Sequence, residues 1–205
     1  MLQLIKKDMA IHKLSWLIYS VITFVYMFAG NDIIFIIALM SAIIIVNVFY
    51  ADERANGHKL WNAMPFTRRE IVSARYMSLI IIIFFNMLLV MTIELVMAGG
   101  LELAFWKEVM GSFILILITS AIFIPILYSL AQQNAVFLLY VLYILLVIGA
   151  VYLFYYFYLY LTDNFIIPQT LSNVQFFGFG IVFSICLYIL SCVLSVKIYK
   201  NKVIT

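Results

Sequence analysis

Long apolar runs alternate with short polar breaks along the chain. A helix needs about 20 apolar residues to cross the hydrocarbon core of a bilayer, so these runs predict membrane-spanning helices. Six spans are expected, at about 14–30, 33–50, 77–98, 109–130, 136–158 and 176–196. Residues 109–162 include no charged residue and are too many for one helix. The polar break Gln132-Gln133-Asn134 is therefore expected to divide a hairpin there.

The composition indicates an all-α polytopic membrane protein with a single transmembrane domain over residues 1–205. The chain is 67% hydrophobic and only 10% charged, whereas soluble domains have about a quarter charged residues. The net charge of +3 comes from basic residues that form no stripe, so no nucleic-acid partner is expected. Cys186 and Cys192 would lie roughly 9 Å apart along one helix, too far for a disulfide between them.

Basic residues gather on one side of the predicted membrane. With six spans, all 12 lysines and arginines except Lys107 fall on the side that holds both termini and the loop 51–76. The positive-inside rule places that side in the cytoplasm. The opposite side has acidic residues instead: Asp32, Glu102, Glu108 and Asp163. Two basic ends on one side require an even number of spans, which supports six.

Two further elements are expected outside the spans. Residues 1–13 repeat apolar side chains at helical spacing with lysines off that stripe, which predicts an N-terminal interfacial helix. Residues 159–175 are apolar but interrupted by Asp163-Asn164 and Pro168. This outer segment is too short to cross twice, so a re-entrant or interfacial segment before span six is expected, with protein covering its backbone.

The loop 51–76 is the most polar stretch of the chain. Thr67 and Glu70 have the spacing of a capping box, and Phe66 and Ile71 that of a hydrophobic staple. A helix is therefore expected to begin at Thr67 and to continue unbroken into the third span. Three basic side chains of this helix are expected to meet lipid headgroups or a partner: Arg68, Arg69 and Arg75.

A short amphipathic helix is expected before this cap, at residues 58–64, because Pro65 would stop it. Leu60, Trp61 and Met64 share one face of it. Such a face suits docking into a groove on a soluble protein. An interfacial helix with Trp61 as its membrane anchor explains the same pattern equally well.

The order of residues in this loop also carries a family resemblance. Asp52-Glu53 is followed by Trp61, then by Met64-Pro65-Phe66-Thr67-Arg68-Arg69-Glu70-Ile71-Val72, and then by Ala74-Arg75-Tyr76. This pattern resembles the first cytoplasmic loop of ABC-2-type ABC-transporter permeases, with Met64 and Arg75 where that family usually has Leu and Lys. The six-span layout, the interfacial helix and the outer segment also resemble these small transmembrane subunits, over essentially the whole chain.

The resemblance implies a coupling helix at about 52–64, on which separate ABC-type ATPase subunits with bound ATP and Mg act. It implies export by alternating access through a dimer with a second permease copy or a paralogue, in a bacterial plasma membrane. Similar small permeases occur in exporters of cytolytic or antimicrobial peptides such as phenol-soluble modulins, so amphipathic peptide cargo is expected. The residues expected to couple to the ATPase are Asp52, Glu53, His58, Lys59, Leu60, Trp61, Met64, Pro65, Arg68 and Arg69.

The residues themselves argue against an enzyme. The chain has no G-x-x-x-x-G-K-[ST] loop, so it is expected to bind no cofactor, and ATP must be bound by a partner. His12 and His58 lie outside the predicted spans, and no Asp lies inside one. Intramembrane zinc, Ser–His and aspartyl proteases are therefore disfavoured, and no metal site is expected.

A few residues inside the spans are candidates for a transport pathway or gate. Glu94 could lie near the outer interface, contact cargo or couple to protons. Asn86 could line a path or join helices, and Pro125 could form a structural kink or a hinge. Tyr155 and Tyr156 could belong to an aromatic belt, a subunit interface or a cargo surface. Two alternatives to an exporter stay open: an ATP-independent peptide-immunity or sensor protein, and a secondary transporter that uses Glu94.

Overall fold

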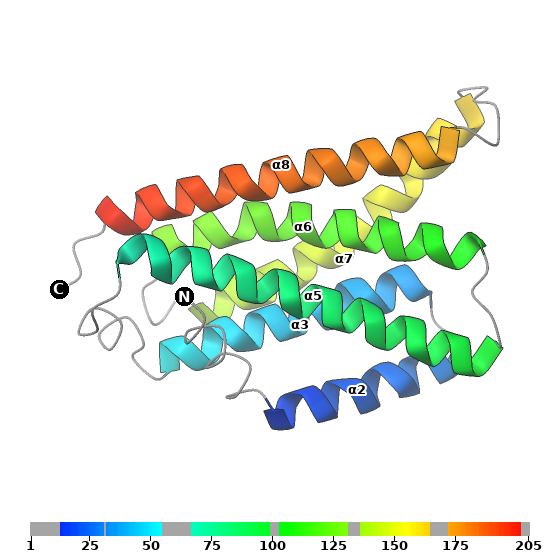
Figure 1. Ribbon diagram of the computed structural model, residues 1–205, viewed down its shortest axis with the longest axis horizontal. Coiled ribbons are helices and arrows are strands. Elements are labelled where there is room, and N and C mark those ends of the chain that lie inside the picture. Colours follow the sequence, from blue (N-terminus) through cyan, green and yellow to red (C-terminus); the bar gives the residue numbers. More distant parts are fainter. Residues whose placement is uncertain are drawn as a thin grey trace.

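Long helices make up the described part of the chain. In the computed structural model this part comprises residues 13–30, 32–54, 67–98, 103–130, 136–164 and 172–201. The helices are α2 (Lys13–Phe28), α3 (Ile33–Arg54), α5 (Arg68–Ala98), α6 (Leu103–Leu130), α7 (Val136–Asn164) and α8 (Ser172–Asn201). They are arranged lengthwise in one bundle (Figure 1). These residues include no strand, so the predicted all-α class is confirmed.

Five of these helices are long and apolar enough to cross a membrane, namely α3, α5, α6, α7 and α8. The first described helix, α2, has 16 residues. At 1.5 Å per residue it rises about 24 Å, which is less than the roughly 30 Å of a hydrocarbon core. The described helices thus form a polytopic bundle with five full-length spans and a shorter first helix.

Most helices extend beyond the apolar runs that predicted them. A helix satisfies its own backbone hydrogen bonds, so it need not stop where apolar residues stop. Helix α5 includes the predicted extension from the cap at Thr67, and α3 ends at Arg54 instead of 50. Helix α6 begins at Leu103 instead of 109, α7 ends at Asn164 instead of 158, and α8 covers Ser172–Asn201 instead of 176–196.

Besides the short helix predicted in the loop, two predicted elements lie wholly or partly outside the described residues. The N-terminal interfacial helix was expected at 1–13, and the description begins at residue 13. In the outer segment 159–175, residues 159–164 end α7 and residues 172–175 begin α8, while residues 165–171 are not described. The interfacial helix and the re-entrant form of the outer segment therefore stay predictions.

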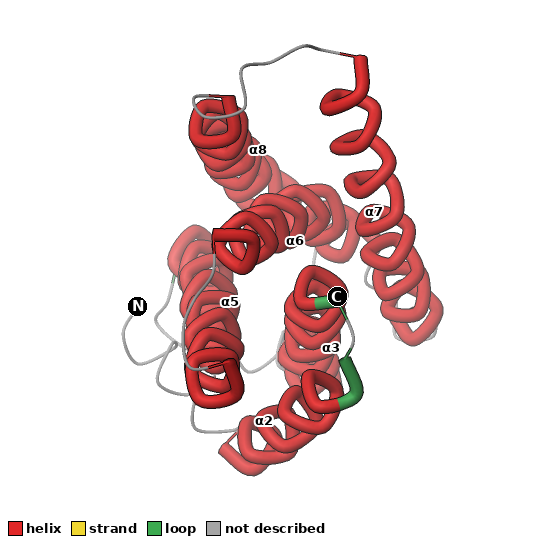
Figure 2. The backbone as a smooth tube through the Cα atoms, turned by 90° about the vertical axis from the view of Figure 1, so that its right-hand side faces the viewer, coloured by secondary structure: helices red, strands yellow, loops and turns green. Residues whose placement is uncertain are grey.

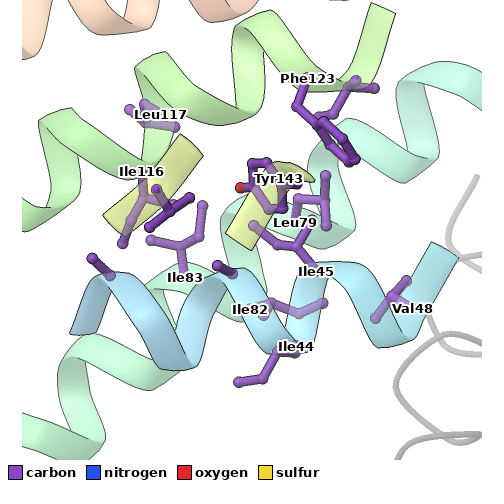
Figure 3. Close-up of a cluster of buried hydrophobic side chains, with 14 of the residues drawn as sticks. Ile44, Ile45, Val48, Leu79, Ile82, Ile83, Ile116, Leu117, Phe123 and Tyr143 are labelled. Atoms are coloured by element: carbon purple, nitrogen blue, oxygen red, sulfur yellow. The ribbon is translucent and has the colours of Figure 1, made fainter. Parts of the chain in front are cut away.

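Helices α3 and α6 occupy the centre of the bundle, with the other helices around them (Figure 2). In their apolar windows 56% of the α3 residues and 67% of the α6 residues are buried, against 22% for α7 and for α8. Aliphatic side chains from α3, α5 and α6 meet Tyr143 of α7 in the core (Figure 3). The Phe123 ring stacks on the Tyr143 ring with centroids 4.1 Å apart.

Hydrogen bonds between polar side chains join several pairs of helices inside this apolar bundle. In lipid, burial of apolar surface gives little driving force for helix association, so helices associate through close packing and hydrogen bonds between them. The joined pairs are Tyr19 of α2 with Asn47 of α3, Ser41 of α3 with Asn86 of α5, Ser120 of α6 with Tyr143 of α7, and Tyr76 of α5 with Ser191 of α8.

Candidate coupling site

Helix α5 begins at the same end of the bundle where α8 ends (Figure 1). We call this the basic end, defined by Arg68, Arg69, Arg75, Lys197 and Lys200. It follows directly on residues 55–66, which contain most of the predicted coupling contacts. The geometry of the basic end therefore determines what a force on that loop would reach.

A reciprocal capping box fixes the start of α5. The backbone amide and the hydroxyl of Thr67 both donate to Glu70 Oε2, each at 2.9 Å. The Glu70 amide donates in return to Thr67 Oγ1 at 3.3 Å. From this cap the helix continues through 31 residues to Ala98. The predicted cap and the unbroken helix into the third span are confirmed, whereas Phe66 of the predicted staple lies outside the described residues.

The cap is expected to hold the first turn of α5 closed. Thr67→Ala should raise hydrogen exchange of the Glu70 amide about fivefold, because the capping oxygen that accepts from this amide is lost. Exchange in detergent micelles, followed by mass spectrometry, measures this. Thr92→Ala on the same helix is the matched control, since the Thr92 hydroxyl bonds the Leu89 carbonyl of its own helix and caps nothing. Equal exchange in both variants would contradict the role of the cap.

Arg68 ties the start of α5 to the end of α8. Its Nη1 donates to the carbonyls of Tyr199 at 3.2 Å and Lys200 at 2.9 Å. Carbonyls in the last turn of a helix lack partners within the helix, so an arginine there satisfies them and suits the negative end of the helix dipole. The guanidinium also lies 6.0 Å from the Tyr199 ring centroid. The sequence placed Arg68 at headgroups or a partner and did not foresee this contact.

Arg75 corrects one expectation from the sequence. It was expected to meet headgroups or a partner, yet only 9% of its surface is exposed. Its guanidinium carbon lies 5.1 Å from the centroid of the Phe49 ring on α3. The cause is helical periodicity: Val72 and Leu79, three residues before and four after, are both fully buried, so position 75 faces the bundle.

The other predicted coupling residues are placed only in part. Asp52 and Glu53 lie in the last turn of α3, and their side chains are outside the description. Arg69 is exposed on the first turn of α5. His58, Lys59, Leu60, Trp61, Met64 and Pro65 lie outside the described residues. The coupling helix stays a prediction, and the described site is the capped start of α5 with its contacts to α3 and α8.

Glu94 lies near the opposite end of α5 and is half-buried. Glu108 of α6 is within electrostatic range of both Glu94 and Asp32. Glu94 thus shares its end of the bundle with the acidic residues that the sequence assigned to the outer side. Within the described residues no group of three or more histidines, cysteines or acids is arranged to hold a metal ion.

Two of the candidate pathway residues lie within the bundle. Asn86 is 3% exposed, and its Nδ2 donates to Ser41 Oγ of α3 at 2.8 Å. This contact fits the interpretation that Asn86 joins helices. Pro125 lies inside α6, which continues as one helix from Leu103 to Leu130. Its role as a kink or hinge stays a prediction.

The two candidate tyrosines of α7 face outward. Tyr155 is 57% and Tyr156 is 67% exposed, and their ring centroids lie 6.0 Å apart. In a membrane such an aromatic surface meets lipid headgroups, a second subunit or cargo. All three alternatives named from the sequence remain consistent with this exposure.

Sequence reasoning missed a buried polar stripe on α8. Ser184, Tyr188, Ser191 and Ser195 recur at spacings of four, three and four, and each is at most 4% exposed. Tyr76 of α5 lies against this stripe, with its hydroxyl 2.7 Å from Ser191 Oγ and 2.8 Å from Ser195 Oγ. The spacing of these residues in an otherwise apolar run was the available signal.

The long apolar helices and their buried polar contacts define a polytopic helical membrane protein. A family model of ABC-2 family transporter proteins matches residues 3–200. The chain therefore belongs to the ABC-2 transporter family and is the membrane permease component of an ABC transporter, a kind of subunit that works with ABC ATPase subunits. Neither the curated proteins nor the solved structures that were compared give a match.

Proposed function

We propose that this permease belongs to an ATP-driven exporter of amphipathic, cytolytic-type peptides. The observation that carries the proposal is the construction of α5. The helix is capped at Thr67, directly after the loop, and is continuous from Arg68 to Ala98. A displacement of the loop would therefore be delivered along an unbroken element to the far end of the bundle.

The source of that displacement would be a separate ABC ATPase that docks on residues 52–64. The sequence has no phosphate-binding loop of its own, which supports a partner as the site of ATP and Mg.

One bundle of this size encloses little space, so we propose a dimer with a second copy or a paralogue. Basic residues at both termini and in the loop support cytoplasmic termini in a bacterial plasma membrane.

Amphipathic peptides suit the side chains that the bundle offers. The exposed aromatic residues of α7, among them Tyr152, Tyr155 and Tyr156, present apolar rings with polar hydroxyl groups. Such rings accommodate the two faces of an amphipathic helix. In this proposal cargo passes between the two permease halves as they alternate between inward-open and outward-open arrangements.

Co-purification followed by reconstitution tests the proposal. Tagged permease should carry an ABC ATPase subunit with it, and proteoliposomes of the complex should accumulate a fluorescent amphipathic helical peptide only with ATP and Mg. A scrambled peptide of the same composition, without an apolar face, is the control. Absence of an ABC ATPase would overturn the proposal. Peptide binding without ATP-dependent transport would indicate a sensor or immunity protein. Transport that is driven by a proton gradient and is lost in Glu94→Gln would indicate a secondary transporter.

A further inference from the structure

Pro125 leaves one backbone carbonyl of α6 without its usual helical partner. Proline has no backbone N–H, so the Ala121 carbonyl, four residues earlier, loses the hydrogen bond it would otherwise accept. In a membrane interior a freed backbone group must be satisfied by other protein groups. Ser191 of α8 does this, because its hydroxyl donates to the Ala121 carbonyl at 2.7 Å.

The same hydroxyl is linked to α5. Ser191 has a single proton, which the Ala121 carbonyl accepts, so the Tyr76 hydroxyl must be the donor in its 2.7 Å bond to Ser191 Oγ. Tyr76 in turn has a single proton, so Ser195 is the donor in the 2.8 Å bond to the Tyr76 hydroxyl. A directed chain of hydrogen bonds thus leads from Ser195 through Tyr76 and Ser191 to Ala121.

Further contacts fix Tyr76 in this chain. The Tyr188 hydroxyl donates to the Tyr76 carbonyl at 2.9 Å, and the two ring centroids lie 4.9 Å apart. Tyr76 itself is 3% exposed. It lies nine residues after Thr67, or about 14 Å along the helix from the cap. The contact between α5 and α8 is therefore close to the point where a force on the loop would enter.

We propose that Tyr76 and Ser191 are positioning residues that join α5, α6 and α8 into one moving unit. A displacement of the loop before Thr67 would pass through Tyr76 to Ser191 of α8 and, through the carbonyl freed by Pro125, to α6. Without Ser191, α5 and α8 would still be joined by Tyr188 and Ser195, but the hydrogen-bonded link to the Ala121 carbonyl of α6 would be lost. The source of the displacement rests on the proposed function, whereas the junction itself is a property of this chain alone.

Pro125 gives the junction a specific test. Ser191→Ala leaves the Ala121 carbonyl buried without a partner and should lower the folding equilibrium constant about tenfold. Pro125→Ala supplies the missing N–H to the same carbonyl, so in that background Ser191→Ala should have less than about a threefold effect. Reversible unfolding of the four variants in mixed detergent micelles measures this difference. Ser191→Thr, which keeps the hydroxyl, should retain most of the stability that Ser191→Ala loses.

Ser184→Ala is the matched control, because the buried Ser184 hydroxyl bonds the Ile181 carbonyl of its own helix. Its effect should be the same with Pro125 and with Pro125→Ala. An equal effect of Ser191→Ala in both backgrounds would overturn the inference, since any purely packing role of Ser191 would be indifferent to Pro125.

A second measurement tests the shared motion. With Cys186→Ala and Cys192→Ala as background, spin labels at the exposed positions Phe84→Cys of α5 and Val182→Cys of α8 report their separation. In the complex of the labelled permease with its ATPase, the distance between the two labels should be equal in the nucleotide-free and the ATP–vanadate states. When Tyr76→Phe is added, this distance should differ between the two states. A change in the otherwise unsubstituted chain would refute the moving unit. If no ATPase binds, the proposed function fails, and the Pro125 comparison still decides the junction.

Discussion

Arg75→Ala is expected to lower the free energy of unfolding by about 2 kcal/mol, the order found for desolvated cation–π contacts. Arg75 is only 9% exposed, and its guanidinium carbon lies 5.1 Å from the centroid of the Phe49 ring on α3. Alanine removes both the contact with the ring and the packing of the stem. Equilibrium unfolding of the purified permease in mixed detergent micelles provides the measurement.

Arg69→Ala is the matched control for this prediction. It removes the same side chain and the same positive charge from the same end of α5, but Arg69 is exposed. Its substitution should leave the unfolding midpoint almost unchanged. Arg75→Lys should fall between the two, since lysine keeps the charge but lacks the planar group that stacks on a ring. If Arg75→Ala and Arg69→Ala shift the midpoint equally, Arg75 does not stabilise the contact with α3.

Local signals in the sequence were sufficient to predict where α5 begins. Thr67 and Glu70 are three residues apart, so their hydrogen bonds depend only on the conformation of one helical turn. The apolar runs likewise located every described helix, because each run must be removed from water wherever it packs. The helix ends were less predictable: α6 begins at Leu103, whereas the predicted span began at about 109, after the charged residues Lys107 and Glu108.

Contacts between distant residues could not be derived in this way. Tyr76 and Ser191 are 115 residues apart, and their bond depends on how α5 and α8 are rotated against each other. Arg75 shows a related limit, because its charge suggested exposure while its helical position next to Val72 and Leu79 requires burial. Where charge and periodicity disagree inside one helix, periodicity gave the correct orientation here.

Pro125 illustrates what the structure adds to a correct local prediction. The sequence indicates a broken hydrogen bond in α6, and it offers a kink or a hinge as the result. The structure adds the group that bonds the freed Ala121 carbonyl, which is the donating hydroxyl of Ser191 on α8. When a proline frees the carbonyl four residues before it, and another helix donates a hydrogen bond to that carbonyl, the two helices are attached at that point. This attachment therefore restrains relative motion of α6 and α8 at that point.

Replacing Leu60 and Trp61 together with alanine is expected to weaken association of the ATPase subunit more than tenfold. Truncation of a buried interface tryptophan often costs at least about 2 kcal/mol, and about 1.4 kcal/mol corresponds to tenfold. The spans should still insert, because the substitutions lie in the loop before the cap of α5. Titration of purified ATPase against permease in lipid nanodiscs measures the affinity. Lys59→Gln with Arg54→Gln, which keeps the apolar face, is the control and should mainly change the salt dependence.

The fluorescence of Trp61 can distinguish docking of the loop on the ATPase from anchoring of the loop in the membrane. With Trp16→Phe and Trp106→Phe, Trp61 is the only tryptophan left of the three in the chain. If Trp61 docks on the ATPase, its fluorescence should shift to shorter wavelength when the ATPase is added and should resist quenching by brominated lipid. If Trp61 instead anchors the loop in the interface, brominated lipid should quench it with or without the ATPase. Normal ATPase affinity in the double alanine variant, together with lipid quenching, would refute the docking role and leave the capped start of α5 as the contact to test.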